Sequence, residues 1–412
     1  MSVTLSTCQE EAKLNFINFL SNQHEQEFCL SGQAGSGKSF LVKHLVKEIP
    51  AANKVAKVFN PNSKGISGVV YCATTNKAAG ILADAVNKNV ETVHSLFSLI
   101  MKFDDDTGEA YWIRSNRPVK FGTSDLIFIE ESSMVGKDLL KLILANVTPT
   151  NKICWLGDSL QLFPVKEDNC PVFVRKTFNA ELNTVIRFDN ENIKNTCEIL
   201  RQSVSENKLL KLTENENVKV LSRPEFDARL LKANKEGINC KFIAWTNTRV
   251  NAYGLKIHEH LYGTREYSIG QKLMVKKACL TSDSNMLTTQ TELIIERQPM
   301  DINITLGKGK IDVTMLYTNK GTLIVPKHRA KAMKLLKPLK DAREWVRYNS
   351  EVQKLAQVTS AYSITCHQAQ SSTYHTVFID LSNIMRNPNK EEMLRLIYVA
   401  ASRASHNIYF CK

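Results

Sequence analysis

An eight-residue stretch, residues 32–39, constrains this chain more than any other part of it. It reads Gly-Gln-Ala-Gly-Ser-Gly-Lys-Ser, which fits the pattern G-x-x-x-x-G-K-S. A mostly apolar run at residues 27–30 precedes it and predicts a buried strand, and residues 40–46 follow with the apolar spacing of a helix. A strand, a glycine-rich loop and a helix in this order are typical of a site that binds nucleotide phosphates.

The residue types in this loop suit a phosphate. Glycines let backbone N–H groups turn toward phosphate oxygens, and the N-terminus of the following helix adds partial positive charge. Lys38 can reach the β- and γ-phosphates, and the Ser39 hydroxyl can bind Mg²⁺. We therefore expect ATP and Mg²⁺ as cofactors. The loop residues expected to hold them are Gly32, Gly35, Ser36, Gly37, Lys38 and Ser39.

Length, charge and cysteine usage bound the class of protein. A chain of 412 residues is expected to form two or three domains. The net charge of +13 favours a polyanionic partner such as nucleic acid, although a merely solvated basic surface is the alternative. The ten cysteines form no C-x-x-C pair, which argues against a zinc ribbon and indicates a reducing, cytoplasmic compartment. No apolar run approaches 18 residues, so we expect no membrane span.

Further apolar runs predict an α/β chain with parallel sheets. The predicted strands are residues 69–73, 126–129, 153–156, 242–245 and 376–380, and residues 53–67 are predicted to be a surface loop. The run at 126–129 ends in Glu130 and Glu131. Two carboxylates at the end of a buried strand are costly unless they bind something. We expect Mg²⁺ and the water that attacks the γ-phosphate to be held there.

Two stretches interrupt the α/β pattern. Turn residues flanked by aromatic ones predict a β-hairpin around residues 103–113, and its aspartate run lacks the final glutamate of a calcium loop. Residues 264–325 alternate strands and turns, which predicts a small β-barrel-like insertion. Residues 327–347 read as helical, with eight Lys or Arg and with Pro338, which should break or kink the helix. A solvated charged face and a contact with nucleic acid are equally open for this stretch.

The order of the motifs resembles superfamily 1 helicases, most closely the group around the phage Dda protein and RecD. The residues that carry the resemblance are the phosphate loop, Thr75-Asn76-Lys77 after a strand, the Glu130-Glu131 pair, and Gly157-Asp158-Ser159-Leu160-Gln161. The resemblance implies an α/β fold with two RecA-like parallel-sheet domains. It also implies a β-hairpin insertion in the first domain and a mostly β, SH3-like plus helical insertion in the second. The implied boundaries are 1–180 for the first domain with its hairpin at about 97–122, 181–263 and 356–412 for the second domain, and 264–355 for the insertion.

The resemblance also implies a function. It points to an enzyme, an ATP-dependent DNA helicase that moves 5′→3′ on single-stranded DNA and unwinds duplex in phage DNA replication or recombination. If the chain is phage-encoded, the compartment is the cytoplasm of the host bacterium. The expected partners are single-stranded DNA and forked duplex DNA, with a single-strand-binding protein or a replisome component as a candidate. The protein is expected to act as a monomer and to have no membrane partner.

Residue roles carry over from the matching motifs. The implied catalytic residues are Lys38, Glu131, Gln161, Arg187 and Arg403, with Glu131 as the catalytic carboxylate and the two arginines as fingers from the second domain. Gln9 would recognise adenine, Gln370 would contact the nucleotide, and Ser39 and Glu130 would hold the metal. The positions that match strand-binding motifs are Thr75, Asn76, Lys77, Thr92, His94, Thr246, Asn247, Arg249, Thr365, His367 and Ser372. Phe97, Tyr111 and Trp112 are candidates to stack on bases, with core packing as the alternative role of each.

The chain departs from the family pattern at four positions. Glu130 stands where the family has Asp, Gln368 and Ser371 stand where it has Lys and Gly, and Phe163 replaces a proline and could pack under a base or against the hairpin. These departures keep a second hypothesis open, a helicase-fold protein that binds single-stranded nucleic acid with weak or lost ATPase activity. A third hypothesis, a phosphate-loop small-molecule kinase, would need neither arginine finger.

Overall fold

The chain divides into two compact units. The computed structural model describes residues 5–33, 35–104, 109–164, 167–175, 177–184 and 190–412. The first unit comprises Met1–Met101, Trp112–Thr213 and Asn389–Ser405. The second unit comprises Lys102–Tyr111, Glu214–Pro388 and His406–Lys412.

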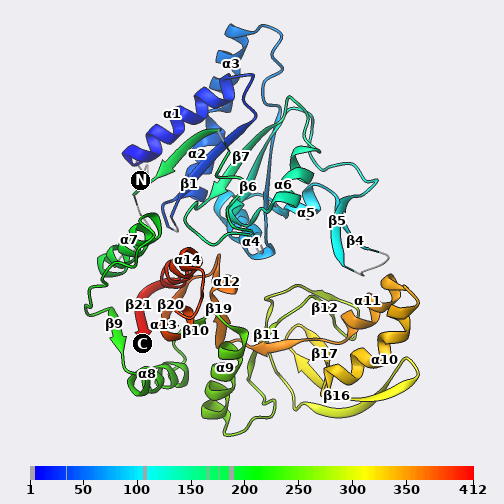
Figure 1. The fold of residues 1–412 in the computed structure, drawn as a ribbon. Coiled ribbons are helices and arrows are strands. Elements are labelled where there is room, and N and C mark those ends of the chain that lie inside the picture. Colours follow the sequence, from blue (N-terminus) through cyan, green and yellow to red (C-terminus); the bar gives the residue numbers. More distant parts are fainter. Residues whose placement is uncertain (1–4, 34, 105–108, 165–166, 176, 185–189) are drawn as a thin grey trace. The chain divides into compact units, whose positions relative to one another are not determined.

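The first unit is built on a six-stranded parallel sheet (Figure 1). Its spatial order is β3-β2-β6-β7-β1-β8, so the chain crosses over repeatedly to add strands on both sides of β1. The strands are β1 Glu27–Gly32, β2 Gly68–Ala73, β3 Glu91–Thr92, β6 Asp125–Glu130, β7 Lys152–Gly157 and β8 Phe178–Leu182. The four strands predicted for this part of the chain, β1, β2, β6 and β7, are confirmed.

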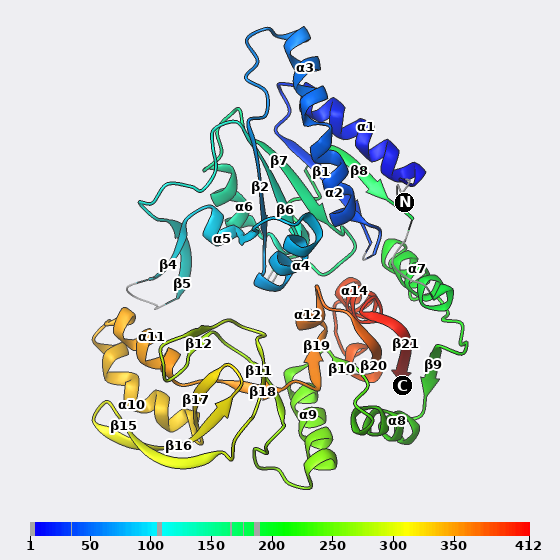
Figure 2. The same ribbon diagram turned by 180° about the vertical axis from the view of Figure 1, so that it is seen from behind.

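Helices cover both faces of this sheet, as the two opposite views show (Figures 1 and 2). Phe128 of β6 packs in one core with Phe16 and Leu41, whereas its neighbour Ile129 packs in another core with Trp155. This alternation is the two-residue period of a strand buried on both faces. The helices of the first unit are α1 Thr7–Ser21, α2 Lys38–Lys47, α3 Ile49–Phe59, α4 Asn76–Val86, α5 Val93–Leu96, α6 Lys137–Leu144, α7 Glu191–Ser205 and α14 Lys390–Ala401, with a 3₁₀ turn at Ser132–Met134.

Helix α3 corrects the prediction of a loop over residues 53–67. The helix continues to Phe59, and only the residues after it are irregular. Ile49, Ala52 and Ala56 recur with helical spacing and are buried. Burial of this apolar face outweighs the asparagine and lysines that suggested a loop.

The predicted hairpin is present. Strands β4 (Leu99–Phe103) and β5 (Ala110–Arg114) form a two-stranded sheet. The tip of the hairpin, residues 105–108, lies outside the described residues.

The second unit contains a five-stranded parallel sheet in the order β19-β10-β20-β21-β9. Its core includes Phe226, Phe242 and Phe378, which meet edge to face. The strands are β9 Val218–Leu221, β10 Cys240–Ala244, β19 Ser363–Thr365, β20 Tyr374–Asp380 and β21 Ala404–Cys411. The helices beside them in the chain are α8 Arg223–Lys235, α9 Asn247–Tyr262, α12 Cys366–Ala369 and α13 Leu381–Ile384.

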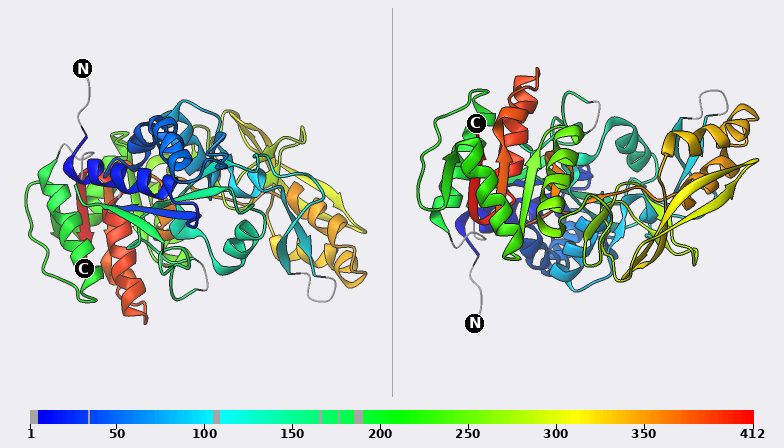
Figure 3. Two further views of the ribbon diagram at one scale, coloured as in Figure 1. Left: turned by 90° about the horizontal axis from the view of Figure 1, so that it is seen from above. Right: turned by 90° about the horizontal axis from the view of Figure 1, so that it is seen from below.

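A β-rich insertion with two helices completes the second unit (Figure 3). Its antiparallel sheets consist of β14-β11-β18, β12-β13 and β15-β16-β17. The bounds are β11 Lys272–Val275, β12 Cys279–Leu280, β13 Met286–Leu287, β14 Glu292–Ile294, β15 Met300–Leu306, β16 Gly309–Thr318, β17 Gly321–Pro326 and β18 Val358–Ser360, with α10 Arg329–Asp341 and α11 Trp345–Lys354. Two parallel sheets with this insertion confirm the predicted fold class.

Pro338 lies inside α10, so of the two predicted outcomes the break is wrong and the kink stays a prediction. The helix continues to Asp341, and the chain turns at Arg343, which has a left-handed φ of 58°. A proline so close to a helix C-terminus removes one backbone hydrogen bond and leaves the turns before it intact.

Two further expectations concern the whole chain. All ten cysteines are free thiols, and nine of them are buried. None of the helices in the described part of the chain is both long and apolar enough to cross a membrane.

Candidate nucleotide-binding site

The phosphate loop joins β1 to α2 at the carboxyl end of the first unit's parallel sheet. Gly35 and Gly37 have φ values of 84° and 82°, in the left-handed region that glycine adopts without penalty. A Cβ atom on Gly32 would lie 2.7 Å from Ser36 Oγ, so this glycine is required by close packing. The Lys38 ammonium donates to the backbone carbonyls of Gly32 at 2.6 Å and Gln33 at 3.1 Å, which places its charge inside the loop.

Four buried side-chain oxygens at this edge of the sheet lack a hydrogen-bond partner among the described residues. They are Ser36 Oγ, Glu130 Oε2, Ser133 Oγ and Gln161 Oε1. Buried polar atoms in proteins are nearly always paired, and exceptions call for an explanation such as a ligand. All four follow the ends of β1, β6 or β7, where open parallel sheets hold ligands. Hydroxyl, amide and carboxylate oxygens beside a lysine fit a nucleotide phosphate with Mg²⁺.

The two adjacent glutamates differ in environment. Burial raises the pKa of Glu130 to about 7, and the charge of Glu131 adds to this rise while Lys38 opposes it. Glu131 begins the 3₁₀ turn with a left-handed φ of 56°, which is uncommon for a residue with a side chain. Unusual backbone geometry and a shifted carboxyl pKa in one place are typical of catalytic sites.

The loop after β7, which contains Gln161, is fixed by α14 and α7. Asp158 is fully buried, and its carboxylate accepts hydrogen bonds from Arg201 and from the Tyr398 hydroxyl, both at 2.7 Å. Arg395 donates to the carbonyls of Ser159 at 3.0 Å and Gln161 at 2.7 Å. The backbone of this loop is therefore held rigidly beside the phosphate loop of the same unit.

Sequence reasoning missed Arg395, Tyr398 and Arg201. The Arg395 guanidinium also lies 3.9 Å from the centre of the Phe163 ring, a cation–π contact that explains the use of an aromatic residue there. A signal for Arg395 existed, because it is the one charge in the apolar part of α14 after Glu392, and a buried charge is rare unless it is paired. Nothing local marks Arg201 as the partner of Asp158.

Gln9 is buried and both ends of its amide have partners. Its side-chain oxygen accepts from Ser6 N at 3.1 Å in a capping box of α1, and its nitrogen donates to Ser36 O at 3.4 Å. It therefore ties the start of α1 to the phosphate loop. Recognition of adenine by Gln9 stays a prediction.

One of the two predicted arginine fingers lies among the described residues. Arg187 lies outside the described residues. Arg403 follows α14 and is buried, and it donates to the carbonyl of Val399 and the hydroxyl of Ser402 in the last turn of that helix. Gln370, in the second unit, is buried, and its side-chain nitrogen has no hydrogen-bond acceptor within the described ranges. The roles of these residues toward a nucleotide stay predictions.

Four threonines predicted to bind a nucleic-acid strand are N-caps of helices. Each lies where a strand passes into a helix, and its hydroxyl accepts a backbone N–H three residues later. They are Thr75, Thr92, Thr246 and Thr365. The caps account for these threonines without a ligand, while Asn76, Lys77 and Asn247 beside them are exposed. Gln368 completes a capping box with Thr365, which gives this departure from the family pattern a local role.

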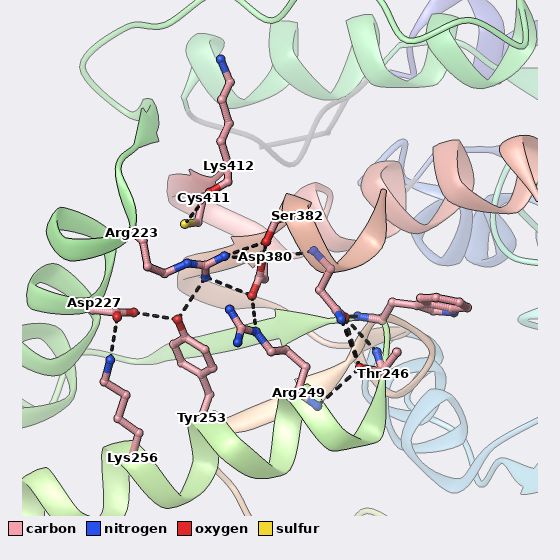
Figure 4. A network of polar contacts seen from close by, with 12 residues as sticks. Arg223, Asp227, Thr246, Arg249, Tyr253, Lys256, Asp380, Ser382, Cys411 and Lys412 are labelled. Carbon is pink, nitrogen blue, oxygen red and sulfur yellow. Dashed lines mark hydrogen bonds and ion pairs between the residues drawn. The ribbon is translucent and has the colours of Figure 1, made fainter. Parts of the chain in front are cut away.

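Arg249 belongs to a polar network centred on a buried carboxylate (Figure 4). Asp380 accepts hydrogen bonds from Arg249 Nε at 2.7 Å and from both terminal nitrogens of Arg223 at 3.0 Å. Burial raises the pKa of Asp380, but the hydrogen bonds from Arg223, Ser382 and Arg249 outweigh it and hold the pKa below its usual value. The network explains the arginine without a nucleic-acid contact, which stays a prediction.

The remaining predicted strand-binding residues vary in exposure. Phe97 is fully buried against Phe121, so it cannot stack on a base. Trp112 is partly exposed, and its ring lies 4.1 Å from that of His94. Burial lowers the pKa of His94, which favours a neutral ring at pH 7. His367 is half-buried and Ser372 is buried, with its hydroxyl on the carbonyl of Gln370 at 3.5 Å.

Two family models match this chain. A family model described as an AAA domain matches residues 6–223, and one described as a UvrD-like helicase C-terminal domain matches residues 360–411. An uncharacterized protein of Acanthamoeba polyphaga mimivirus is 21% identical, with 98% of this chain and 99% of that protein covered. The ATP-dependent DNA helicase Pif1 of Campylobacter jejuni is 24% identical over 92% of this chain and 86% of its own length. The ATP-dependent DNA helicase Dda of phage T4 is 26% identical over 42% of this chain and 37% of its own length.

Two solved structures share the fold. A Pif1 helicase, described with DNA unwinding at forked double-stranded DNA, has a TM-score of 0.53 at 17% identity and covers 99% of this chain and 92% of its own. Pif1 from Bacteroides, in complex with ADP-AlF3 and single-stranded DNA, has a TM-score of 0.51 at 16% identity with the same coverage. At these identities the likeness concerns the fold alone.

The fold and the site together define a phosphate-loop nucleotide-binding protein. The AAA domain model matches more than half of the chain, and the chain belongs to that family. It is a superfamily 1 helicase of the Pif1/Dda group, a class of enzymes that hydrolyse ATP.

Proposed function

We propose that this protein is an ATP-dependent DNA helicase that moves 5′→3′ along single-stranded DNA and unwinds the duplex ahead of it. The observation that supports it most is a group of buried oxygens around the phosphate loop that lack a hydrogen-bond partner among the described residues, those of Ser36, Glu130 and Gln161. The relatives named DNA helicases support DNA as the substrate. The direction and a role in phage replication or recombination rest on the resemblance to Dda.

Hydrolysis is assigned to residues of the first unit. Lys38 exchanges the carbonyls of Gly32 and Gln33 for phosphate oxygens. Ser39 and Glu130 would hold Mg²⁺, which would supply neutralisation of the phosphate charge. Glu131 orients the attacking water and accepts its proton.

Gln161 senses the γ-phosphate from a loop that Arg395 and Asp158 hold in place. Because Arg395 fixes the loop backbone to α14, a displacement of Gln161 on phosphate binding would also displace α14. Arg187 and Arg403 are proposed to stabilise the charge of the transition state.

The test is ATP hydrolysis with and without single-stranded DNA, paired with unwinding of one duplex that has a 5′ tail and one that has a 3′ tail. We expect strong stimulation by the strand and unwinding from the 5′ tail alone. Unwinding from the 3′ tail would overturn the direction. DNA binding without any stimulation would favour a strand-binding protein that has lost its ATPase.

A further inference from the structure

Helix α10 of the second unit has two chemically opposite faces. Ala332 and Leu336 are buried in a core with Leu306, Ile311 and Val313 of β15 and β16. The helix lies along this sheet (Figure 3). Its outer face carries four exposed lysines, Lys331, Lys334, Lys337 and Lys340.

The turn between β15 and β16 packs against α10. A Cβ atom on Gly309 would lie 2.6 Å from the Leu335 side chain, and one on Gly307 would lie 3.2 Å from the Leu335 carbonyl. Gly307 also has a left-handed φ of 60°. The two glycines therefore let the turn rest directly on α10 and leave the outer face of the helix to its own lysines. We call the four residues Lys331, Lys334, Lys337 and Lys340 the lysine ridge.

Within the described residues the ridge is not neutralised by any carboxylate, whereas three cations near it are. Lys327 pairs with Asp301, and on α11 Arg347 pairs with Glu344 and Lys354 with Glu351. Across the described residues, no ion pair involves any lysine of the ridge. The only acidic residue in the sequence of α10 is Asp341 at its end. Lysines three residues apart on a helix are surface neighbours and repel each other, so a polyanion would relieve this repulsion.

We propose that the lysine ridge binds the phosphate backbone of double-stranded DNA without reading its sequence. Lysine is a point charge suited to phosphate, and its contacts carry no base information. Sites for single strands combine charge with aromatic platforms for the bases. Neither α10 nor the turn at residues 306–310 contains an aromatic residue, so the ridge offers charge alone. That suits a duplex, whose bases are stacked inside.

The size of the ridge is adequate for this role. From Lys331 to Lys340 the helix rises about 14 Å, a length over which duplex DNA presents roughly eight phosphate charges. The proposal deepens the proposed function and rests on it, because it assigns a surface that holds the duplex while a strand is unwound. The binding itself requires no ATP.

The experiment compares two quadruple variants of the full chain. One changes the ridge (Lys331→Ala, Lys334→Ala, Lys337→Ala, Lys340→Ala). The other removes four lysines that each pair with a glutamate three or four residues away, Lys13, Lys194, Lys232 and Lys354, and so changes net charge equally. Binding of a labelled blunt duplex and of a labelled single strand is measured over a range of salt concentrations.

We expect the ridge variant to lose about tenfold or more in duplex affinity at low salt, with a salt slope smaller by about 0.9 for each phosphate contact removed. The paired-lysine variant should keep the wild-type slope, and four Lys→Arg changes in the ridge should restore it. If the ridge variant lost as much affinity for the single strand as for the duplex, the ridge would be assigned to single strands. If its salt slope for the duplex equalled that of the paired-lysine variant, the ridge would take no part in duplex binding. Either result overturns the proposal.

The strand-stimulated ATPase of the wild type and of the ridge variant separates this proposal from the proposed function. We expect the ridge variant to retain stimulation by a single strand. A wild-type protein without stimulation would refute the motor, yet its duplex binding would still report on the ridge.

Discussion

The two parallel sheets use buried polar residues at their carboxyl edges in opposite ways. In the first unit, Glu130 and Gln161 each have a buried oxygen without a hydrogen-bond partner in the described part of the chain. In the second unit, Asp380 occupies a similar position at the end of β20, and both of its carboxylate oxygens accept hydrogen bonds from arginines. The buried carboxylate of the first edge keeps an oxygen available for a ligand, whereas the buried carboxylate of the second edge is satisfied by neighbouring arginines.

This difference fits the proposed catalytic role of the first edge and a structural role of the second. Buried polar groups without partners reduce stability and persist where function requires them. A buried carboxylate held by two arginines is costly to remove, because its partners are then left uncompensated, and its oxygens are already used by protein donors. Changes at the first edge should therefore remove activity with little loss of stability, and changes at the second should do the reverse.

The largest effect is expected from Lys38→Ala. Removing the one cation inside the phosphate loop should lower the rate of ATP hydrolysis by about 10²–10³-fold or more, the scale seen when one preorganised charge-stabilising group is lost. The melting temperature should change little, because the loop keeps its glycines. Lys43→Ala, an exposed lysine on the same helix, is the matched control and should keep full activity. Strand-stimulated hydrolysis that survives Lys38→Ala would show that the phosphate site is misassigned.

Asp380→Ala is expected to act on stability instead. It leaves Arg223 and Arg249 without their shared partner, and we expect a loss of about 2–4 kcal/mol in the free energy of unfolding of the second unit, slightly below the usual cost because both arginines are partly exposed. Denaturant unfolding measures this loss. Glu259→Ala breaks an exposed pair with Arg265 in the same unit and should change the free energy of unfolding far less, because solvent screens this pair.

The stability difference between the wild type and Asp380→Ala should depend on pH. The pKa of Asp380 is lowered in the folded protein, so its ionised form stabilises the fold above the ordinary aspartate pKa of about 3.9. The difference between wild type and Asp380→Ala should therefore shrink as the pH falls below about 4. A difference that stays constant down to pH 2 would mean that the arginines do not stabilise the ionised carboxylate.

Sequence patterns predicted the catalytic edge better than the structural one. The phosphate loop, the Glu130-Glu131 pair and Gln161 each follow an apolar run within a few residues, so a local pattern was enough to place them at the sheet edge. The pairing of Arg249 with Asp380 joins positions 131 residues apart. No local pattern contains such a contact, which only the packing of β10, α9 and β20 creates.

The same limit explains the other errors. From sequence alone, a threonine before a helix fits both a helix cap and a contact with a nucleic-acid strand. Only the structure shows that the Thr246 hydroxyl accepts a hydrogen bond from the backbone N–H of Arg249. Helix α3 was predicted as a loop because its polar residues were weighed without knowledge of the core that covers Ala52. Arg395 was missed because its partners, the carbonyls of Ser159 and Gln161, are backbone groups that leave no mark in a sequence.

Glu130→Gln tests whether the buried carboxyl at the first edge lowers the free energy of unfolding when it is ionised. The pKa of Glu130 is raised to about 7 in the folded protein, so its protonated form stabilises the fold fully below pH 4.5. This contribution to the free energy of unfolding is lost as the pH rises through 7. The unfolding free energy of the variant relative to wild type should therefore rise by about 1–3 kcal/mol between pH 4.5 and pH 8. The exposed Glu11→Gln is the matched control for the effect of a glutamate-to-glutamine change itself. A flat difference for Glu130→Gln would mean that the carboxyl is not strained by burial.

The smallest effect is expected from a change at Ser371. This residue follows Gln370, which is buried at the second edge and whose side-chain nitrogen lacks an acceptor among the described residues. Ser371 has a left-handed φ of 58°, a conformation that costs a residue with a Cβ about 1–2 kcal/mol. Ser371→Gly should remove this cost, and after the added flexibility of the unfolded chain the protein should gain about 0.5–1 kcal/mol. Ser282→Gly, at an exposed position without a left-handed φ, should instead lose stability.

Hydrolysis measured on the same Ser371→Gly variant decides how Gln370 is used. If the strained backbone holds Gln370 toward a nucleotide, relaxing it should raise KM for ATP while kcat stays within about twofold, since only a binding group is displaced. If both constants stay unchanged, the left-handed residue is a consequence of the tight turn after α12, and the second edge is structural throughout. A loss of stability in Ser371→Gly would contradict the assignment of strain to this residue.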